Sequence, residues 1–246
     1  MKRISRRNIG ASAKSRATAG FTLIEMLISL AILVTVTGAV FEQINTMQKK
    51  ANSEAVNLDL NQQSRDFLDQ TVRDLHATGY PSARMYSAGQ LAPATMVANG
   101  LVRVSPTEIL LEGDVNNDGY VYSVDILYVA NDPNDPNCPC IRRSAEHKVD
   151  ADSLNQGTTP FYTETQHVLS GTGPGQSGED LFTYFDQKGA TVDLSNGGDT
   201  STPAGIANLA KIKTVKINLS LLTNQRDPQS GGFTRTSMSA SARLNY

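Results

Sequence analysis

A nearly unbroken apolar segment runs from Gly20 to Phe41 near the start of the chain. About 20 residues at a rise of roughly 1.5 Å each span a hydrocarbon core of about 30 Å, so this segment is long enough to cross a bilayer as a helix. One acidic residue, Glu25, interrupts it. A carboxylate costs on the order of 2.5 kcal/mol or more at the membrane centre, so Glu25 is a candidate functional residue.

The helical pattern continues beyond the apolar segment. Residues 21–76 contain no proline and one glycine, which predicts one long helix over residues 21–78 with its transmembrane part at about 21–41. In the outer half, apolar residues recur at helical spacing: Leu60, Phe67, Leu68, Val72 and Leu75. Polar residues occupy positions between them: Asp59, Arg65, Asp66, Gln70, Arg73 and Asp74. We expect the apolar stripe to lie on a sheet, and a coiled-coil seam is the alternative.

The remainder of the chain, residues 79–246, has the pattern of a globular β domain outside the membrane. Six segments bounded by turn residues are predicted strands: 108–112, 120–130, 140–144, 181–185, 211–223 and 233–246. No helical pattern suited to repeated parallel crossovers separates them, so the sheet is expected to be antiparallel. The sequence therefore predicts an α+β fold, in which a long N-terminal helix packs on an antiparallel sheet.

Charge is unevenly distributed along the chain. The first 20 residues contain six cations and no acid, and the positive-inside tendency places such a leader in the cytoplasm and the remainder outside it. Without residues 1–20 the chain has 16 basic and 24 acidic residues. This acidic balance argues against general nucleic-acid binding, which depends on cations that neutralise phosphates.

The residues around Gly20 resemble the N-terminal processing motif of type IV pilins and of the pseudopilins of type II secretion systems. Small residues end at Gly20, and Phe21, Thr22, Leu23, Ile24 and Glu25 follow. In that family a prepilin peptidase cuts after the glycine, methylates the new N-terminal phenylalanine and leaves the apolar helix on the mature protein. The resemblance implies cleavage between Gly20 and Phe21, N-methylation of Phe21 and removal of residues 1–20. A plain signal anchor with a stray glutamate is the alternative.

The resemblance also implies a function. Glu25 matches the family glutamate at mature position five, which pairs with the N-terminal amine of a neighbouring subunit during assembly. The chain is then a structural subunit of a type IV filament, a minor pilin or minor pseudopilin, serving pilus biogenesis or type II secretion. Its expected partners are other pilin subunits, the prepilin peptidase and the inner membrane, before it enters a periplasmic or cell-surface filament. The alternative is a pilin-anchored binding module, either an adhesin or a DNA-uptake component.

Catalysis is not expected, since no nucleophile elbow, zinc-protease motif or phosphate-binding loop occurs. No cofactor is required, but one loop has the oxygen spacing of calcium loops, with a glycine at position six. Its ligands would be Asp114, Asn116, Asp118, Tyr120 through its carbonyl, and Asp125 at position twelve. Position twelve lacks the bidentate glutamate and the flanks have strand patterns, so the sequence favours a hairpin turn, with calcium binding as the alternative.

The two cysteines, Cys138 and Cys140, are separated by a single proline. This spacing is one residue short of the usual redox or metal-binding pair, and no second pair completes a tetrahedral site. Outside the cytoplasm the two thiols are candidates for a local disulfide that fixes a proline-rich loop.

Overall fold

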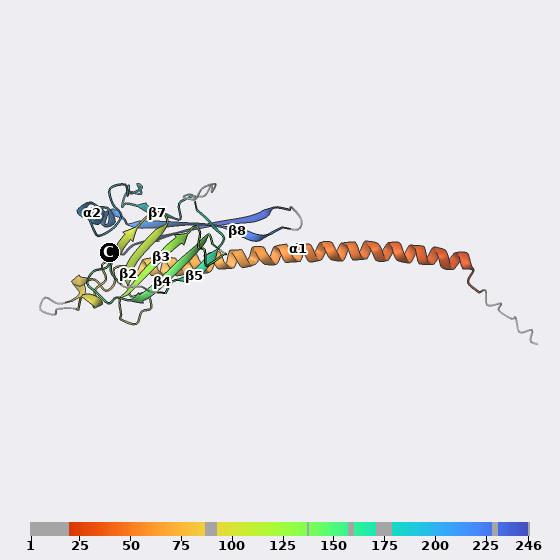
Figure 1. The fold of residues 1–246 in the computed structure, drawn as a ribbon, viewed down its shortest axis with the longest axis horizontal. Coiled ribbons are helices and arrows are strands. Elements are labelled where there is room, and N and C mark those ends of the chain that lie inside the picture. The colour runs from red at the N-terminus through yellow and green to blue at the C-terminus, as the bar shows by residue number, and fades with distance from the viewer. Residues whose placement is uncertain are drawn as a thin grey trace, which may run out of the picture. The chain divides into compact units, whose positions relative to one another are not determined.

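The computed structural model describes residues 20–86, 93–136, 138–156, 160–170, 179–227 and 231–245 (Figure 1). Residues 1–19 of the predicted leader lie outside the described residues, as does Tyr246 of the last predicted strand. The chain divides into two compact units, residues 1–48 and residues 49–246.

One helix, α1, extends from Leu23 to Ala77 and confirms the predicted long helix. We call residues 23–48 its inner half and residues 49–77 its outer half. The helix ends just before Gly79, which has a φ of 79° and donates its backbone N–H to the carbonyl of Glu112 at 2.8 Å. A glycine after the last turn accepts this left-handed conformation without the strain that a side chain would add.

Five antiparallel strands form sheet 1 in the order β1-β2-β3-β4-β5 (Figure 1). They are β1 (Leu101–Val104), β2 (Glu108–Gly113), β3 (Tyr122–Val129), β4 (Cys140–His147) and β5 (Tyr162–Gln166). The predicted strands 108–112, 120–130 and 140–144 correspond to β2, β3 and β4. Neither β1 nor β5 was predicted, because β1 is only four residues long and four of the five residues of β5 are exposed, so neither shows alternation.

Sheet 2 is also antiparallel and has β8 (Thr214–Arg226) at its centre. Along one edge β8 pairs with β9 (Phe233–Arg243), and along the other it pairs with β6 (Val168–Leu169) and β7 (Phe182–Phe185). The sequence predicted a single sheet, whereas the structure has two. They are connected at His167, whose φ of 54° breaks the extended chain between β5 and β6.

A short helix, α2 (Pro203–Lys211), precedes β8, and the prediction of a strand from residue 211 was wrong at its start. Thr202 caps the helix by accepting a hydrogen bond on Oγ1 from the Gly205 N–H at 3.0 Å, and Pro203 occupies the first turn. A capping threonine before a proline is a helix-start signal. Two single 3-10 turns, η1 (Ala83–Met85) and η2 (Ala94–Met96), lie between α1 and β1.

The outer half of α1 and both sheets share one hydrophobic core. Four residues of the predicted apolar stripe are buried, and Val72 packs against them; the buried four are Leu60, Phe67, Leu68 and Leu75. The interpretation of the stripe as a sheet-facing surface is therefore confirmed. Asp74 was expected among the polar positions, and that expectation was wrong, since its side chain is fully buried and accepts a hydrogen bond from Arg143 Nε of β4 at 2.9 Å.

Candidate processing and assembly site

The start of α1 is fixed by Thr22. Its carbonyl accepts hydrogen bonds from the N–H groups of Glu25 at 3.1 Å and Met26 at 3.2 Å. Its Oγ1 also lies 3.4 Å from the Glu25 nitrogen, in the position of an N-cap. Gly20 and Phe21 consequently lie outside the helix. Phe21 is 74% exposed, and a Cβ placed on Gly20 would meet no atom within 4 Å.

The inner half of α1 exposes its apolar side chains all round. By length and composition α1 is the one described helix that is suited to crossing a membrane, and none of its apolar window is buried. Glu25 sits in the first turn of this exposed helix, where its charge favours the positive end of the helix dipole. Within the described residues no cation lies within ion-pair distance of Glu25.

The family model of the prokaryotic N-terminal methylation motif matches residues 15–41. The chain carries the type IV pilin and pseudopilin signature. No curated protein and no solved structure matches the chain significantly. The pilin-type signature covers Gly20, Phe21, Glu25 and the apolar part of α1, and the two sheets lie beyond it. A motif of this kind indicates a pilin-type precursor.

Outside the pilin-type segment, the loop from Asp114 to Val121 closes the hairpin between β2 and β3. Asp114 is buried, and its two carboxylate oxygens accept hydrogen bonds from the N–H groups of Asp118 and Gly119, each at 3.0 Å. Asp118 in turn accepts hydrogen bonds from the Tyr120 N–H at 3.0 Å and from the Tyr122 hydroxyl at 2.7 Å. The bond from Tyr122 is the main cause that lowers the pKa of Asp118. The carboxylates of Asp114 and Asp118 therefore stabilise the hairpin turn, which the strand patterns on both sides of the loop favoured.

Asp125 does not belong to this loop, so its prediction as the twelfth calcium ligand was wrong. In the β2–β3 register Tyr122 pairs with Gly113 at the hairpin end, whereas Asp125 pairs with Leu110. Three residue pairs at about 3.4 Å each place Asp125 about 10 Å from the hairpin end. It lies instead 3.6 Å from Arg103. Calcium binding by Asp114, Asn116, Asp118 and the Tyr120 carbonyl stays a prediction.

Cys138 and Cys140 are joined by a disulfide at the start of β4. Asp135 is the third potential metal-binding group close to the two sulfurs, within 4.8 Å. It also lies 3.6 Å from Arg142, which pairs with Asp132 at 2.5 Å. Because the sulfurs are bonded to each other, the arrangement fixes the loop between β3 and β4 and offers no thiolate to a metal ion.

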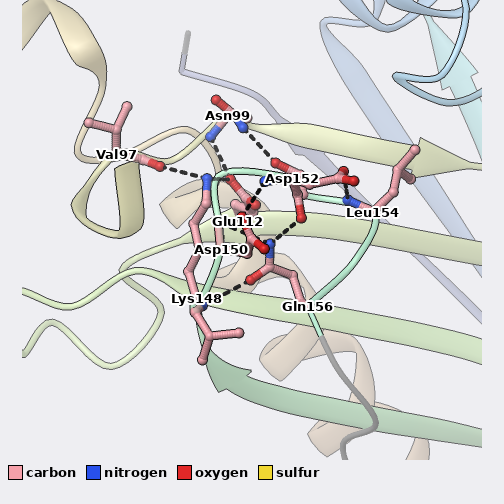
Figure 2. A network of polar contacts seen from close by, with 10 residues as sticks. Val97, Asn99, Glu112, Lys148, Asp150, Asp152, Leu154 and Gln156 are labelled. Carbon is pink, nitrogen blue, oxygen red and sulfur yellow. Dashed lines mark hydrogen bonds and ion pairs between the residues drawn. The ribbon is translucent and has the colours of Figure 1, made fainter. Parts of the chain in front are cut away.

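Figure 2 shows a buried ion pair that the sequence did not reveal. Lys148, just after β4, donates from Nζ to Glu112 of β2 at 2.7 Å and to the Val97 carbonyl at 3.0 Å. Asn99 donates its backbone N–H to the same Glu112 oxygen at 2.9 Å and its side-chain amide to Ser153 at 2.5 Å. The side chains of Lys148 and Glu112 are 1% and 0% exposed, so the pair holds two loops against β2.

Two buried ion pairs, Asp74–Arg143 and Glu112–Lys148, therefore fix the outer domain, and sequence reasoning missed both. Burial raises the pKa of Asp74, and the nearby charge of Arg143 opposes that rise. The partners lie 69 and 36 residues apart, so no local spacing links them. The only local signal was that Asp74 lies one residue before Leu75 of the apolar stripe.

Proposed function

We propose that this chain is a minor pilin or minor pseudopilin, a structural subunit that is processed by a prepilin peptidase and assembled through the inner half of α1. Before processing it is a single-pass protein of the inner membrane with its N-terminus in the cytoplasm. Cleavage after Gly20 and methylation of Phe21 release it to a periplasmic or cell-surface filament. Pilus biogenesis and type II secretion are the two systems that fit this role.

The observation that carries the proposal is an apolar helix that the described part of the chain leaves exposed. The inner half of α1 buries none of its apolar window, although most apolar side chains of this kind find a core in a soluble protein. Lipid covers such a surface before assembly, and the equivalent helices of neighbouring subunits cover it afterwards. The methylation signature on the same helix supports filament assembly as the way in which this surface is finally covered.

Glu25 supplies the register of assembly. After cleavage the Phe21 amine is a positive charge on the apolar helix, and a helix rising about 1.5 Å per residue carries Glu25 away from the amine of its own chain. The glutamate of one subunit and the amine of the next satisfy each other, which removes two costly charges from lipid.

The minor role is supported by the outer domain. Its strands are irregular in length, from two to thirteen residues, and long connections separate them. A subunit present in few copies tolerates such connections better than one that must tile a whole filament. This step rests on analogy within the family.

The test of the proposal is the replacement of Glu25 by leucine. The change removes the charge that opposes membrane partition, so we expect membrane insertion as good as in the wild type or better. Incorporation into filaments is expected to fall, because an unpaired buried amine costs about 3 to 5 kcal/mol. The measured quantity is the ratio of protein in sheared filaments to protein in the membrane.

Glu25→Gln is the matched variant, since it keeps the shape of the side chain and removes its charge. A ratio that falls in both variants supports the ion pair. Equal ratios in the wild type and both variants would show that Glu25 is not an assembly contact, and the proposal would lose its mechanism.

A further inference from the structure

Sheet 2 presents one face to solvent along β8 and β9. In β9 the residues of one face are exposed in strict alternation, namely Phe233, Arg235, Ser237, Ser239, Ser241 and Arg243. In β8 the alternating residues Val215, Ile217, Leu219 and Leu221 are buried, so Lys216, Asn218 and Ser220 lie on the outer face beside β9. We call the outward side chains of β8 and β9 the serine face.

The serine face differs in charge from the domain that carries it. Residues 49–246 contain 22 acidic and 16 basic residues, yet β8 and β9 contain four cations and no acid. The cations are Lys216, Arg226, Arg235 and Arg243. The Glu179 carboxylate lies 3.8 Å from Lys216 Nζ and is 75% exposed, so it neutralises little of the charge of Lys216.

The middle of the serine face is also hollowed and incompletely bonded. A hollow of about 540 Å³ is lined by Lys216, Asn218 and Arg235, by their neighbours on the two strands and by Glu179. Arg235 donates to the Ser220 hydroxyl at 3.3 Å, and that hydroxyl is 2.8 Å from the hydroxyl of Ser237. Asn218 donates to the Asp180 carbonyl at 3.1 Å, but its Oδ1 is buried and has no donor within the described residues. An additional hydrogen-bond donor would satisfy that oxygen.

We propose that the serine face binds the acidic surface of the neighbouring subunit in the filament. This inference rests on the proposed function and adds the partner of the outer domain to it. An assembled filament brings acidic domains of this kind side by side, where like charges repel. A face on which cations outnumber acids relieves this repulsion and orients the contact. Its serine side chains are short, so a second protein surface approaches the strands closely.

The chain itself shows what such an acidic surface looks like. Asp66, Asp69 and Glu164 line a hollow of about 760 Å³ beside β4 and β5. Arg73 and Arg143 also line it, and the charge of Arg143 is paired with Asp74. A contact between two different surfaces of adjacent domains is heterologous, which is the kind of contact that extends into a helical filament.

A protein partner fits the serine face better than a nucleic acid. The four cations align with β8 positions 214 (Arg243), 216 (Lys216), 222 (Arg235) and 226 (Arg226), so successive cations are separated by two, six and four residues along the strands. At about 3.3 Å per residue these intervals are roughly 7, 20 and 13 Å. A nucleic acid strand carries a charge about every 3.4 Å, so such sparse cations would leave most phosphates unpaired.

The inference is tested on sheared filaments that contain the full-length chain with Glu179→Gln, which removes the carboxylate nearest to Lys216. A zero-length carbodiimide joins an amine to a carboxylate in contact with it; the carbodiimide takes up the water released as the amide forms. Peptide mass spectrometry is expected to find Lys216 joined to an aspartate or glutamate of a second subunit. With Arg235→Glu added, we expect the yield to fall about fivefold, whereas Arg235→Lys retains it.

Acetylation of Lys216 gives an independent measurement. We expect it to be several-fold slower in filaments than in protein dispersed from the membrane. A chain that enters filaments while Lys216 stays equally reactive and forms no cross-link to another subunit would overturn the serine-face inference and leave the proposed function standing. Protection that a nuclease removes would overturn it in favour of a nucleic acid. Absence of the chain from filaments would overturn both.

Discussion

The two halves of α1 have the same secondary structure but differ in the burial of their apolar side chains. Leu27 in the inner half is 57% exposed, whereas Phe67 in the outer half is 4% exposed. The outer half restricts its apolar residues to one stripe, which the sheets of its own chain cover. The inner half is apolar all round, and no single face of one domain covers such a helix. The comparison indicates that the outer half serves folding, and we infer that the inner half serves association with lipid or other subunits.

The acids of the two halves follow the same division. Asp74 is buried, and Arg143 lies 2.9 Å from its carboxylate within the same chain. Glu25 has no such cation among the described residues, although it lies in the half that lipid or subunits would cover. One acid has its partner in the fold, and we infer that the other receives its partner only on assembly.

The strongest test of this division replaces a large apolar residue in each half. Phe67→Ala leaves a cavity in the shared core and is expected to lower the free energy of unfolding of the outer domain by about 3 to 5 kcal/mol. Leu27→Ala, the matched change in the inner half, is expected to alter it by less than about 0.5 kcal/mol. Chemical denaturation of the full-length chain in detergent measures both. Similar losses in the two variants would refute the division.

A second test concerns the buried acid. Asp74→Asn leaves Arg143 without its counter-charge, and because that arginine is partly exposed we expect a loss of about 2 to 3 kcal/mol, below the range for fully buried pairs. Asp69→Asn, an exposed acid of the same helix, serves as the control and is expected to change stability by less than about 0.5 kcal/mol. A loss as small in Asp74→Asn as in the control would mean that the pair does not hold α1 to β4.

Asp125 is an intermediate case, a partly buried acid with incomplete pairing. Burial raises its pKa to about 6, Glu108 adds to the rise, and Arg103 at 3.6 Å opposes it. The folded state therefore holds this proton more tightly than the unfolded state, so stability falls as pH rises from about 4 to about 6. In Asp125→Asn we expect the free energy of unfolding to fall by about 1 to 3 kcal/mol less than in the wild type over this pH range. Unfolding curves at several pH values measure it, and Asp66→Asn is the exposed control. An unchanged pH profile would contradict the raised pKa.

The sequence predicted the features that are periodic and local. The stripe that includes Phe67 and Leu75 reveals a buried face because helical spacing repeats over several turns, and the alternation in β8 does the same for a strand. The residues Gly20 to Glu25 form a contiguous motif, so the motif can be recognised without knowledge of the fold.

The features that were missed depend on contacts between distant segments. The burial of Asp74 follows from Arg143, which lies 69 residues away. The exposed strand β5 is held by pairing with β4 rather than by its own pattern. Asp125 lies away from the predicted calcium loop because the residues that follow the loop form a strand. A strand has a larger rise per residue than a helix, so it places Asp125 farther from the loop than a helix would.

The central claim is that the inner half of α1 becomes the N-terminus of a processed subunit. Intact-mass and peptide mass spectrometry of the mature chain tests it most directly. We predict a protein that begins at N-methylated Phe21, and a Gly20→Val variant that is not cut, because the peptidase must fit a scissile residue without a side chain. Gly38→Val is the control and is expected to be processed normally, since its surroundings are equally open. A mature protein that begins elsewhere, or a Gly20→Val variant still cut before Phe21, would contradict the account.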